Sequence, residues 1–421
     1  AQATWISPCD SVIRVRGGRM SIVVVGGGIV GLTAAYYLTR KEQKVILVEK
    51  CSIACHSSGK AGGFLTDGDS GWHRGAVAKL AKHSFALHRD LAKEFGPDNV
   101  GYRSVRCLGH GAGERSALSW LRRDFNCDMG DQDGMAQVSP LKLMAALESA
   151  VRREGCEILI GKVTGVEMDG EKVCAVRVEQ AGQEERLPCR ALVLGMGAWA
   201  REAAAWFPGS SLPTDTVSHR YTSVIWDDAV VGKDATMVFV SEEHDVEIYP
   251  RADECYANGC PTSTELPDDP LEILPPAETI EAVKAETCGA VERLRDAPVL
   301  RTTACFLAGS DDGQPVLGKV PGTENAVIAC GGGCWGILNG PAMGQAAAAM
   351  AMNEETAVDI SAFNPSRFER TSSGALSGLP PKLRDLLAQH PELAQVLQQN
   401  PQEAGRLLQM LQAAQDDSSA A

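Results

Sequence analysis

The sequence predicts an α/β fold with three parts: a domain built on a parallel sheet, an antiparallel α+β domain, and a short helical C-terminal tail. Three observations support this prediction. Residues 22–50 have the pattern of a buried strand, a glycine-rich turn, a helix and a second strand. Residues 213–300 change to short strand-like segments separated by acidic and proline-rich turns. Residues 365–421 form a linker followed by leucine-rich segments broken by prolines.

The parallel-sheet domain is predicted from the first of these segments. Residues 22–25 are all apolar, as in a parallel strand buried on both faces. Gly26, Gly28 and Gly31 follow with G-x-G-x-x-G spacing, which permits a tight turn, close approach of a pyrophosphate and close helix–strand packing. The helix expected from residue 29 to about residue 40 presents its first N–H groups to that pyrophosphate. A second strand ends at Glu49, whose carboxylate is placed to accept hydrogen bonds from ribose hydroxyls.

The complete order of strand, turn, helix, strand and acid predicts a Rossmann-like dinucleotide-binding unit and not a plain βαβ unit. It leaves FAD and NAD open as cofactors, and the carboxylate argues against NADP. The residues expected to contact the dinucleotide here are Gly26, Gly28, Ile29, Val30, Gly31, Glu49 and Lys50.

Small residues dominate the loop that follows the second strand, residues 51–69. Its backbone can lie against a flat ring or a phosphate, and an FAD site needs such a loop whereas an NAD site does not. The alternative is a flexible surface loop. The predicted cofactor contacts are Ser57, Ser58, Gly59, Lys60, Ala61, Gly62 and Gly63.

Composition excludes several classes of partner. A length of 421 residues predicts two packed domains and an appendage. The net charge of -14 argues against nucleic acid and anionic membrane surfaces as partners. No apolar run approaches the length of about 20 residues that spans a bilayer.

The 14 cysteines are scattered through apolar segments without zinc-type spacing, so we expect reduced thiols, no metal site and a reducing, cytoplasmic location. Residues 1–19 hold Arg14, Arg16 and Arg19 against one acid. They are either the remnant of an organelle transit peptide, which would make the protein organellar, or an extension without structural consequence.

Further elements follow in order along the chain. Helices are predicted at residues 72–95, 116–125 and 140–154, and strands at 157–160, 165–168, 173–179 and 190–195. The last strand runs into Met196-Gly197-Ala198-Trp199, a second glycine turn at a strand's carboxyl end, where open α/β sheets bind ligands. A plain tight turn into a helix at 200–206 is the alternative. The cofactor contacts expected in this region are Val163, Gly195, Gly197 and Trp199.

The remaining core divides into two segments. Strands at 221–226, 236–240 and 246–251 and a helix at 277–297 predict an antiparallel substrate domain. A strand at 327–329, a turn at 331–333 and a helix at 341–352 add a third glycine turn, which exceeds what an NAD domain needs. The predicted boundaries are 1–19 for the extension; 20–105, 139–212 and 301–364 for the cofactor domain; 106–138 and 213–300 for the substrate domain; and 365–421 for the linker and tail.

From residue 22 to about residue 364 the chain resembles the D-amino-acid-oxidase-like superfamily of FAD-dependent oxidoreductases, which includes glycine oxidase and sarcosine oxidase. The matching segments are VVVGGGIVGL…VEK, SSGKAGG, VLGMGAWA, DDGQPVLG and GGGCWGILNGPAMG. The SGKAGGFL segment looks most like a less characterised eukaryotic branch.

The resemblance implies an extended FAD, with its pyrophosphate at Gly26–Gly31, its ribose on Glu49 and its ring at the junction with the substrate domain. It implies hydride removal from a C–N or C–O bond of a small amine, amino acid or hydroxy compound, with O2 or another acceptor reoxidising the flavin. Lys60 is a candidate cation for stabilising reduced flavin or superoxide, or else a solvated or phosphate-contacting lysine. The residues expected near the flavin ring are Gly333, Trp335, Gly336, Leu338 and Gly340.

Two positions depart from the family pattern. Leu307 stands where glycine oxidase-like members have the arginine that grips a substrate carboxylate, so a simple amino acid substrate is in doubt. Substitutes are Arg220, Arg251 and Arg301, with Tyr249 beside Arg251, although each arginine is equally compatible with a structural role. Cys305 lies at a spacing similar to that of a flavin-linked cysteine in sarcosine oxidase-like members, but buried cysteines are common and the bond is not required.

The tail loosely resembles STI1-type co-chaperone modules and is a candidate site for a protein partner, or else it packs on the protein itself. We therefore expect an FAD-dependent oxidoreductase acting on a small molecule. The alternatives are a flavoprotein with an assembly, trafficking or scaffold role that uses this tail, and an NAD dehydrogenase.

Overall fold

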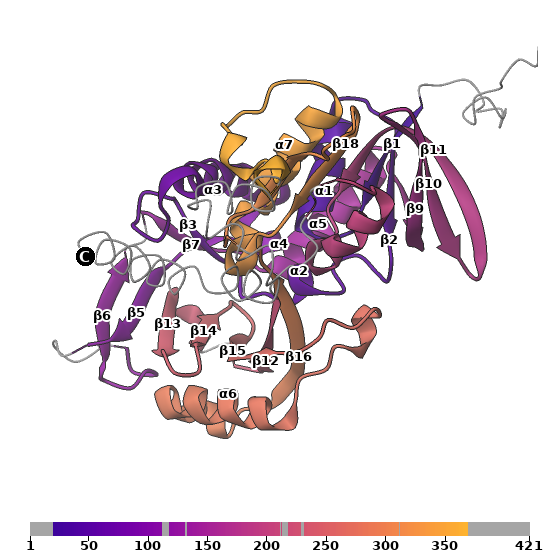
Figure 1. Ribbon diagram of the computed structural model, residues 1–421. Coiled ribbons are helices and arrows are strands. Elements are labelled where there is room, and N and C mark those ends of the chain that lie inside the picture. Colours follow the sequence, from indigo (N-terminus) through magenta and orange to yellow (C-terminus); the bar gives the residue numbers. More distant parts are fainter. Residues whose placement is uncertain are drawn as a thin grey trace, which may run out of the picture. The chain divides into compact units, whose positions relative to one another are not determined.

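The structure is a computed structural model that describes residues 20–111, 118–130, 133–210, 212, 218–228, 231–310 and 312–368 (Figure 1). The predicted extension at 1–19 and all but the first residues of the predicted tail lie outside this part of the chain. None of the helices within it is both long enough and apolar enough to cross a bilayer.

A parallel sheet forms the centre of the first half of the fold. Its strand order is β17-β18-β11-β1-β2-β8, in which all neighbours are parallel except β17, and β9 and β10 extend β11 as an antiparallel blade. Every residue of β1 is buried, which explains its unbroken apolar run. The strands are β1 (Ser21–Val25), β2 (Val45–Glu49), β8 (Glu157–Ile160), β9 (Lys162–Asp169), β10 (Lys172–Gln180), β11 (Gln183–Leu194), β17 (Val316–Lys319) and β18 (Ala326–Cys330).

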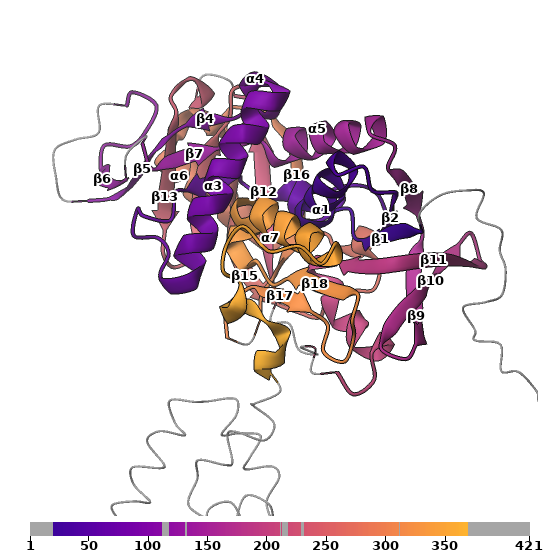
Figure 2. The ribbon, with the colours of Figure 1, turned by 90° about the horizontal axis from the view of Figure 1, so that it is seen from above.

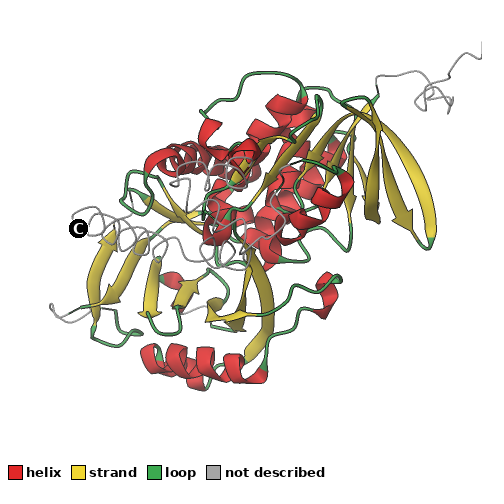
Figure 3. Ribbon diagram, in the orientation of Figure 1, coloured by secondary structure: helices red, strands yellow, loops and turns green. Residues whose placement is uncertain are grey.

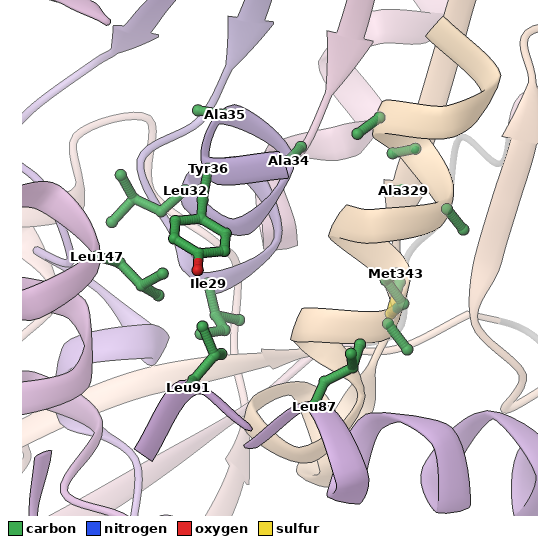
Figure 4. Packing of buried hydrophobic residues seen from close by; sticks show 14 of the residues in the cluster. Ile29, Leu32, Ala34, Ala35, Tyr36, Leu87, Leu91, Leu147, Ala329 and Met343 are labelled. Carbon is green, nitrogen blue, oxygen red and sulfur yellow. The ribbon is translucent and has the colours of Figure 1, made fainter. Parts of the chain in front are cut away.

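Four helices share one hydrophobic core with this sheet: α1 (Ile29–Arg40), α3 (Gly75–Phe95), α5 (Pro140–Arg153) and α7 (Gly336–Ala351) (Figures 2 and 4). Helices α1 and α7 approach very closely. A Cβ atom on Gly340 would lie 2.5 Å from a methyl carbon of Ile29, and one on Gly344 would lie 2.0 Å from Thr33 Oγ1. Glycine is therefore required at these two positions for the helices to touch.

The second half of the fold is a seven-stranded sheet in the order β16-β12-β15-β14-β13-β5-β6 (Figure 3). Helix α6 (Ala277–Ala290) packs on one face through a separate apolar cluster. The strands are β5 (Arg106–His110), β6 (Phe125–Gly130), β12 (Ser218–Trp226), β13 (Thr236–Ser241), β14 (Val246–Pro250), β15 (Cys255–Ser263) and β16 (Val299–Ala308).

Shorter elements link the two halves. A three-stranded sheet contains β3 (Phe64–Thr66), β7 (Met135–Gln137) and β4 (Arg103–Ser104), in the order β3-β7-β4. The short helices are α2 (Ser57–Lys60), α4 (Pro97–Val100), and the 3-10 turns η2 (Gly197–Trp206), η3 (Val231–Lys233), η4 (Pro270–Glu272), η5 (Glu292–Arg295), η6 (Gly333–Trp335), η7 (Ser361–Phe363) and η8 (Pro365–Phe368).

The predicted fold class is confirmed for the described residues, which leave out nearly all of the predicted helical tail, and the strand at 157–160 has the predicted bounds. The helix predicted at 116–125 is wrong, because residues 118–124 form turns and β6 begins at Phe125. The helix predicted at 277–297 ends at residue 290, and the one predicted to start at 341 begins at Gly336. Strand β16 pairs in the second sheet across the predicted boundary at residue 301, and the domain boundaries stay predictions.

Candidate active site

The glycine-rich turn after β1 is packed backbone against backbone. Gly26 has φ +105°, and a Cβ atom there would lie 2.3 Å from the carbonyl oxygen of Gly195 at the end of β11. A Cβ atom on Gly31 would lie 1.8 Å from the carbonyl oxygen of Gly26. These contacts leave bare peptide surface at the start of α1, as a pyrophosphate site requires.

A pocket opens at the carboxyl ends of β1, β2, β11 and β18, which are neighbours in the parallel sheet although they are remote in sequence. Ligands bind at this edge of open α/β sheets. The structure thus brings together, in the lining of one pocket, predicted contacts from all three glycine turns: Gly26, Gly28, Ile29, Val30, Glu49, Lys50, Ser57, Ser58, Ala61, Val163, Gly195, Gly197, Trp199, Gly333 and Gly336.

Glu49 is fixed at the end of β2 by two backbone donors. Its Oε2 accepts from the Gly27 N–H at 2.6 Å, and its Oε1 accepts from the Cys51 N–H at 2.9 Å. Each carboxylate oxygen has a second lone pair, so the group can still accept from a ribose diol. The bare peptide surface and this carboxylate together fit the adenosine diphosphate half of a dinucleotide.

Residues 267–270, between β15 and α6, lie over the Glu49 end of the pocket. Lys50 Nζ donates to the Asp268 carbonyl, lies 3.6 Å from Glu202 Oε1 and stands 5.9 Å from the centre of the Trp199 ring. The Trp199 indole N–H donates to the Pro267 carbonyl at 2.9 Å, and Pro270 lines the pocket.

His56 is a pocket residue that the sequence analysis did not select. Its Nε2 accepts from the Phe306 N–H at 3.2 Å, so the ring proton is on Nδ1 and is donated to Ser57 Oγ at 2.7 Å. Ser57 Oγ in turn donates to the Phe306 carbonyl at 2.7 Å. Burial and the nearby Lys60 charge lower the pKa of His56 to about 3, so the ring is neutral. The network fastens the small-residue loop to β16; the sequence signal for it is a lone histidine inside that loop.

Several predicted contacts lie away from the pocket lining and have packing roles. Cβ atoms on Gly59 and Gly63 would lie 2.1 Å and 2.0 Å from backbone carbonyl oxygens, and Leu338 is fully buried in the core. The Lys60 ammonium donates to the Ala304 carbonyl at 3.0 Å. The predicted residues outside the lining are Gly31, Gly59, Lys60, Gly62, Gly63, Trp335, Leu338 and Gly340.

Arg251 and Tyr249 are occupied by neighbouring groups. The Arg251 guanidinium pairs with Glu254 and donates to the carbonyls of Ala61 and Gly62 at 2.9 Å and 3.2 Å. The Tyr249 hydroxyl donates to Glu247. Neither residue is part of the pocket lining.

The structure shows where Leu307 and Cys305, the two positions that depart from the family pattern, lie relative to the pocket. Leu307 lines the pocket. Cys305 is buried outside the lining, and burial raises the pKa of its thiol to about 11, which disfavours the thiolate that a bond to flavin requires. Within the described residues no group of His, Cys, Asp and Glu side chains is arranged to hold a metal ion.

The comparisons with known proteins agree with this geometry. A family model described as FAD dependent oxidoreductase matches residues 21–350. The putative oxidoreductase C1F5.03c of Schizosaccharomyces pombe is 26% identical over 372 residues, covering 77% of this chain and 92% of that protein. The glycine oxidase of Pseudomonas putida is 24% identical, covering 82% of this chain and 98% of its own.

Solved structures share the fold. The L-proline dehydrogenase of P. horikoshii superposes with a TM-score of 0.71 at 19% identity, covering 84% of this chain and 98% of that one. The family model matches residues 21–350, which contain every glycine turn of the pocket. The chain belongs to the family of FAD-dependent oxidoreductases, and its cofactor is FAD.

Proposed function

We propose that the protein removes a hydride from the carbon of a C–N bond, or of a C–O bond, in a small amine, amino acid or hydroxy compound. Bound FAD supplies the hydride acceptor. The observation that supports the proposal is the continuity of the pocket, which runs from Glu49 and the first glycine turn to Gly333 and Cys334 beside Leu307 of the second sheet. A substrate held at this far end would lie between the two halves of the fold.

The protein's own contribution is positioning. The turn at Gly26–Gly31 and Glu49 would hold the nucleotide half. The turn at Gly331–Gly333 would border the ring, since all three of its glycines line the pocket. The His56 network would keep the loop from residue 56 to residue 63 closed over the cofactor and exclude water.

The electron acceptor and the compartment are also proposals. The similar proteins include one named as an oxidase and one named as a dehydrogenase. The electron acceptors to test are therefore O2 and a separate redox protein. The described cysteines are free thiols, which supports a reducing compartment such as the cytoplasm.

The test is a visible spectrum of the purified protein before and after acid precipitation, followed by anaerobic addition of amines, amino acids and hydroxy acids. Bleaching of a flavin band near ~450 nm by one class of compound supports the proposed chemistry, and its return in air identifies O2 as an acceptor. FAD that no compound bleaches would favour the scaffold role, whose predicted site at residues 365–421 lies almost wholly outside the described residues.

A further inference from the structure

Residues 266–273, which lie between β15 and α6 and include η4, form a segment that we call the strap. Three side chains from the first half of the fold each donate a hydrogen bond to one of three successive strap carbonyls, and we call these side chains the latch. The latch consists of Arg201 Nη2 on the Leu266 carbonyl at 3.3 Å, Trp199 Nε1 on the Pro267 carbonyl at 2.9 Å, and Lys50 Nζ on the Asp268 carbonyl. The strap thus belongs to the second half of the fold by sequence but is held by the first.

Other contacts hold the strap with less force. In the described part of the chain its backbone–backbone hydrogen bonds both run from one strap residue to another, and it contains no strand of either large sheet. Its apolar anchors are Leu266 and Ile273, which are buried in a small cluster with Ala198 and Phe306. Leu271, between the two anchors, is 68% exposed. A segment without sheet pairing opens at a lower free energy than the strands around it, so the latch bonds are a large part of what keeps the strap closed.

The strap meets the pocket at the end where Glu49 lies. Pro270 is the strap residue in the pocket lining, and Glu49 and Glu202 line the pocket as well. Lys50 joins these parts, because its ammonium donates to the strap and lies 3.6 Å from Glu202 Oε1. Since the Glu49 carboxylate is placed to accept from a ribose, we expect the adenosine of FAD to lie between Glu49 and the strap.

The latch does not depend on the cofactor. Each of its bonds joins a protein donor to a protein carbonyl, so the strap can close whether or not FAD is bound. Trp199 and Lys50 line the pocket, whereas Arg201 does not. Arg201 therefore acts on the strap without contacting the cofactor, which makes it the residue that separates strap closure from direct FAD binding.

We propose that the strap is a gate for the cofactor: the adenosine half of FAD enters and leaves when the strap opens, and Arg201 and Trp199 are positioning residues that hold it closed. This inference concerns exchange of the cofactor and goes beyond the proposed function, because it holds for any substrate. It has a kinetic signature. A weaker latch opens the strap more often, so both the release and the binding of FAD become faster and the dissociation constant changes less than either rate.

The first test measures both rates with the full-length protein. FAD release from the holoprotein is followed by FAD fluorescence after dilution, and FAD binding to the apoprotein is followed by stopped flow. Arg201→Met is expected to accelerate both by about two- to tenfold, as the loss of one hydrogen bond permits. Arg122→Met is the matched control, because Arg122 is also exposed, donates to the Gly289 carbonyl at 3.2 Å and is outside the pocket lining. It should change neither rate.

Trp199→Phe is the second variant. It keeps an aromatic ring in the pocket lining but removes the N–H that holds the Pro267 carbonyl. Both rates should again rise, and the double variant with Arg201→Met should exceed either single one.

The second test measures opening of the strap itself by hydrogen exchange of the amides at residues 266–273. Arg201→Met should exchange faster there than wild type in the holoprotein, with the amides of β1 unchanged. ADP, which carries the adenosine half of FAD alone, should protect the strap amides of the apoprotein as FAD does. Protection by FAD and not by ADP would overturn the placement of adenosine beneath the strap.

The remaining outcomes also decide. Faster release with unchanged or slower binding in Arg201→Met would show that Arg201 supports the shape of the site, and it would overturn the gate. Unchanged rates in both Arg201→Met and Trp199→Phe would overturn it too. If one of the two variants does not fold or retains no FAD, the rates of the other and the exchange of the wild-type strap still decide. None of these measurements uses a substrate, so their failure leaves the proposed function standing.

Discussion

The imidazole Nε2 of His88 donates a hydrogen bond to the carbonyl oxygen of Ile337 at 2.8 Å. Ile337 lies four residues before Pro341, which has no N–H to give to it in helix α7. The next N–H, that of Ala342, donates to Ser84 Oγ at 3.1 Å. Side chains of α3 thus satisfy the helix around its proline, so that α7 begins at Gly336, where it borders the pocket.

We predict that His88→Phe lowers the free energy of unfolding by about 1–3 kcal/mol, because it leaves the buried Ile337 carbonyl without a donor. In a Pro341→Ala background the helix can supply that N–H, so His88→Phe is expected to cost less. A double-mutant cycle by urea denaturation measures the difference. An equal cost in both backgrounds would show that His88 acts through packing alone.

The sequence predicted the elements whose signals are local. Residues 22–50 contain their own apolar run, turn glycines and terminal acid, and β1, α1 and β2 formed as expected. The start of α7 was not predictable, because the donor that offsets Pro341 comes from residue 88. Strands β15 and β16 were missed for a similar reason: their pairing with β12 joins segments remote in sequence.

The site was predicted to a similar extent. The glycine turns predicted residues that line one pocket, where we propose that the cofactor binds, but spacing does not distinguish a glycine that faces a pocket from one that faces a protein atom. Gly28 lines the pocket, whereas Gly340 contacts Ile29 and Gly62 contacts the Tyr249 ring. His56 has no neighbours in sequence that indicate its bond to Phe306.

Gly28→Val is predicted to abolish FAD retention while the protein stays folded. A Cβ atom at Gly28 would lie 3.0 Å from Ser58 Oγ, a flexible side chain, so the fold can adjust, but the branched side chain occupies the surface meant for the pyrophosphate. The flavin-to-protein absorbance ratio measures retention. Gly289→Ala in α6, where the nearest atom is 4.0 Å away, is the control and should keep FAD. An unchanged ratio in Gly28→Val would contradict the placement.

Glu49→Arg is expected to lose FAD as well, because a cation replaces the acceptor of the Gly27 and Cys51 N–H groups and of the ribose. Glu49→Gln keeps one acceptor oxygen and should weaken FAD binding by about tenfold to hundredfold. Reconstitution of apoprotein with FAD gives the dissociation constants. Wild-type affinity in Glu49→Arg would remove Glu49 from the site.

Acid should destabilise the protein through His56 and His88. Their pKa values are about 3 and about 4 in the fold, because burial disfavours the charged ring, against an ordinary value of 6.5. Between these limits the unfolded chain binds more protons, so each histidine lowers stability as the pH falls below 6.5, by about 1.4 kcal/mol per pH unit at most. Glu247, with its pKa raised to about 7, gives the opposite slope between its ordinary 4.5 and 7.

The histidine contribution is isolated by comparing variants at the same pH. His56→Gln should flatten the dependence of unfolding free energy on pH between about 4 and 6, and the exposed His219→Gln should not. Thermal or urea unfolding at several pH values gives both slopes. A slope equal to that of wild type in His56→Gln would mean that His56 is already protonated in the fold.

Arg251 and Arg301 offer a matched test of position against charge, because both pair with Glu254. The Arg251 side chain is 9% exposed and also holds the carbonyls of Ala61 and Gly62, whereas that of Arg301 is 41% exposed. Arg301 still pairs with Glu254 in Arg251→Met, so the main loss is the donor to the Ala61 and Gly62 carbonyls. Arg251→Met should therefore cost about 1–3 kcal/mol of stability and accelerate FAD release from the loosened loop. Arg301→Met should cost about 1 kcal/mol or less.

Urea denaturation and stopped-flow FAD release measure the two effects of these variants. The opposite pattern for Arg251→Met would be unchanged stability and unchanged FAD release, with a raised KM for a carboxylate-bearing substrate. That result would return Arg251 to the substrate site as a ligand of a substrate carboxylate, since a free guanidinium would then face the pocket. The stability of Arg251→Met thus tests whether Arg251 belongs to the substrate site or to the fold.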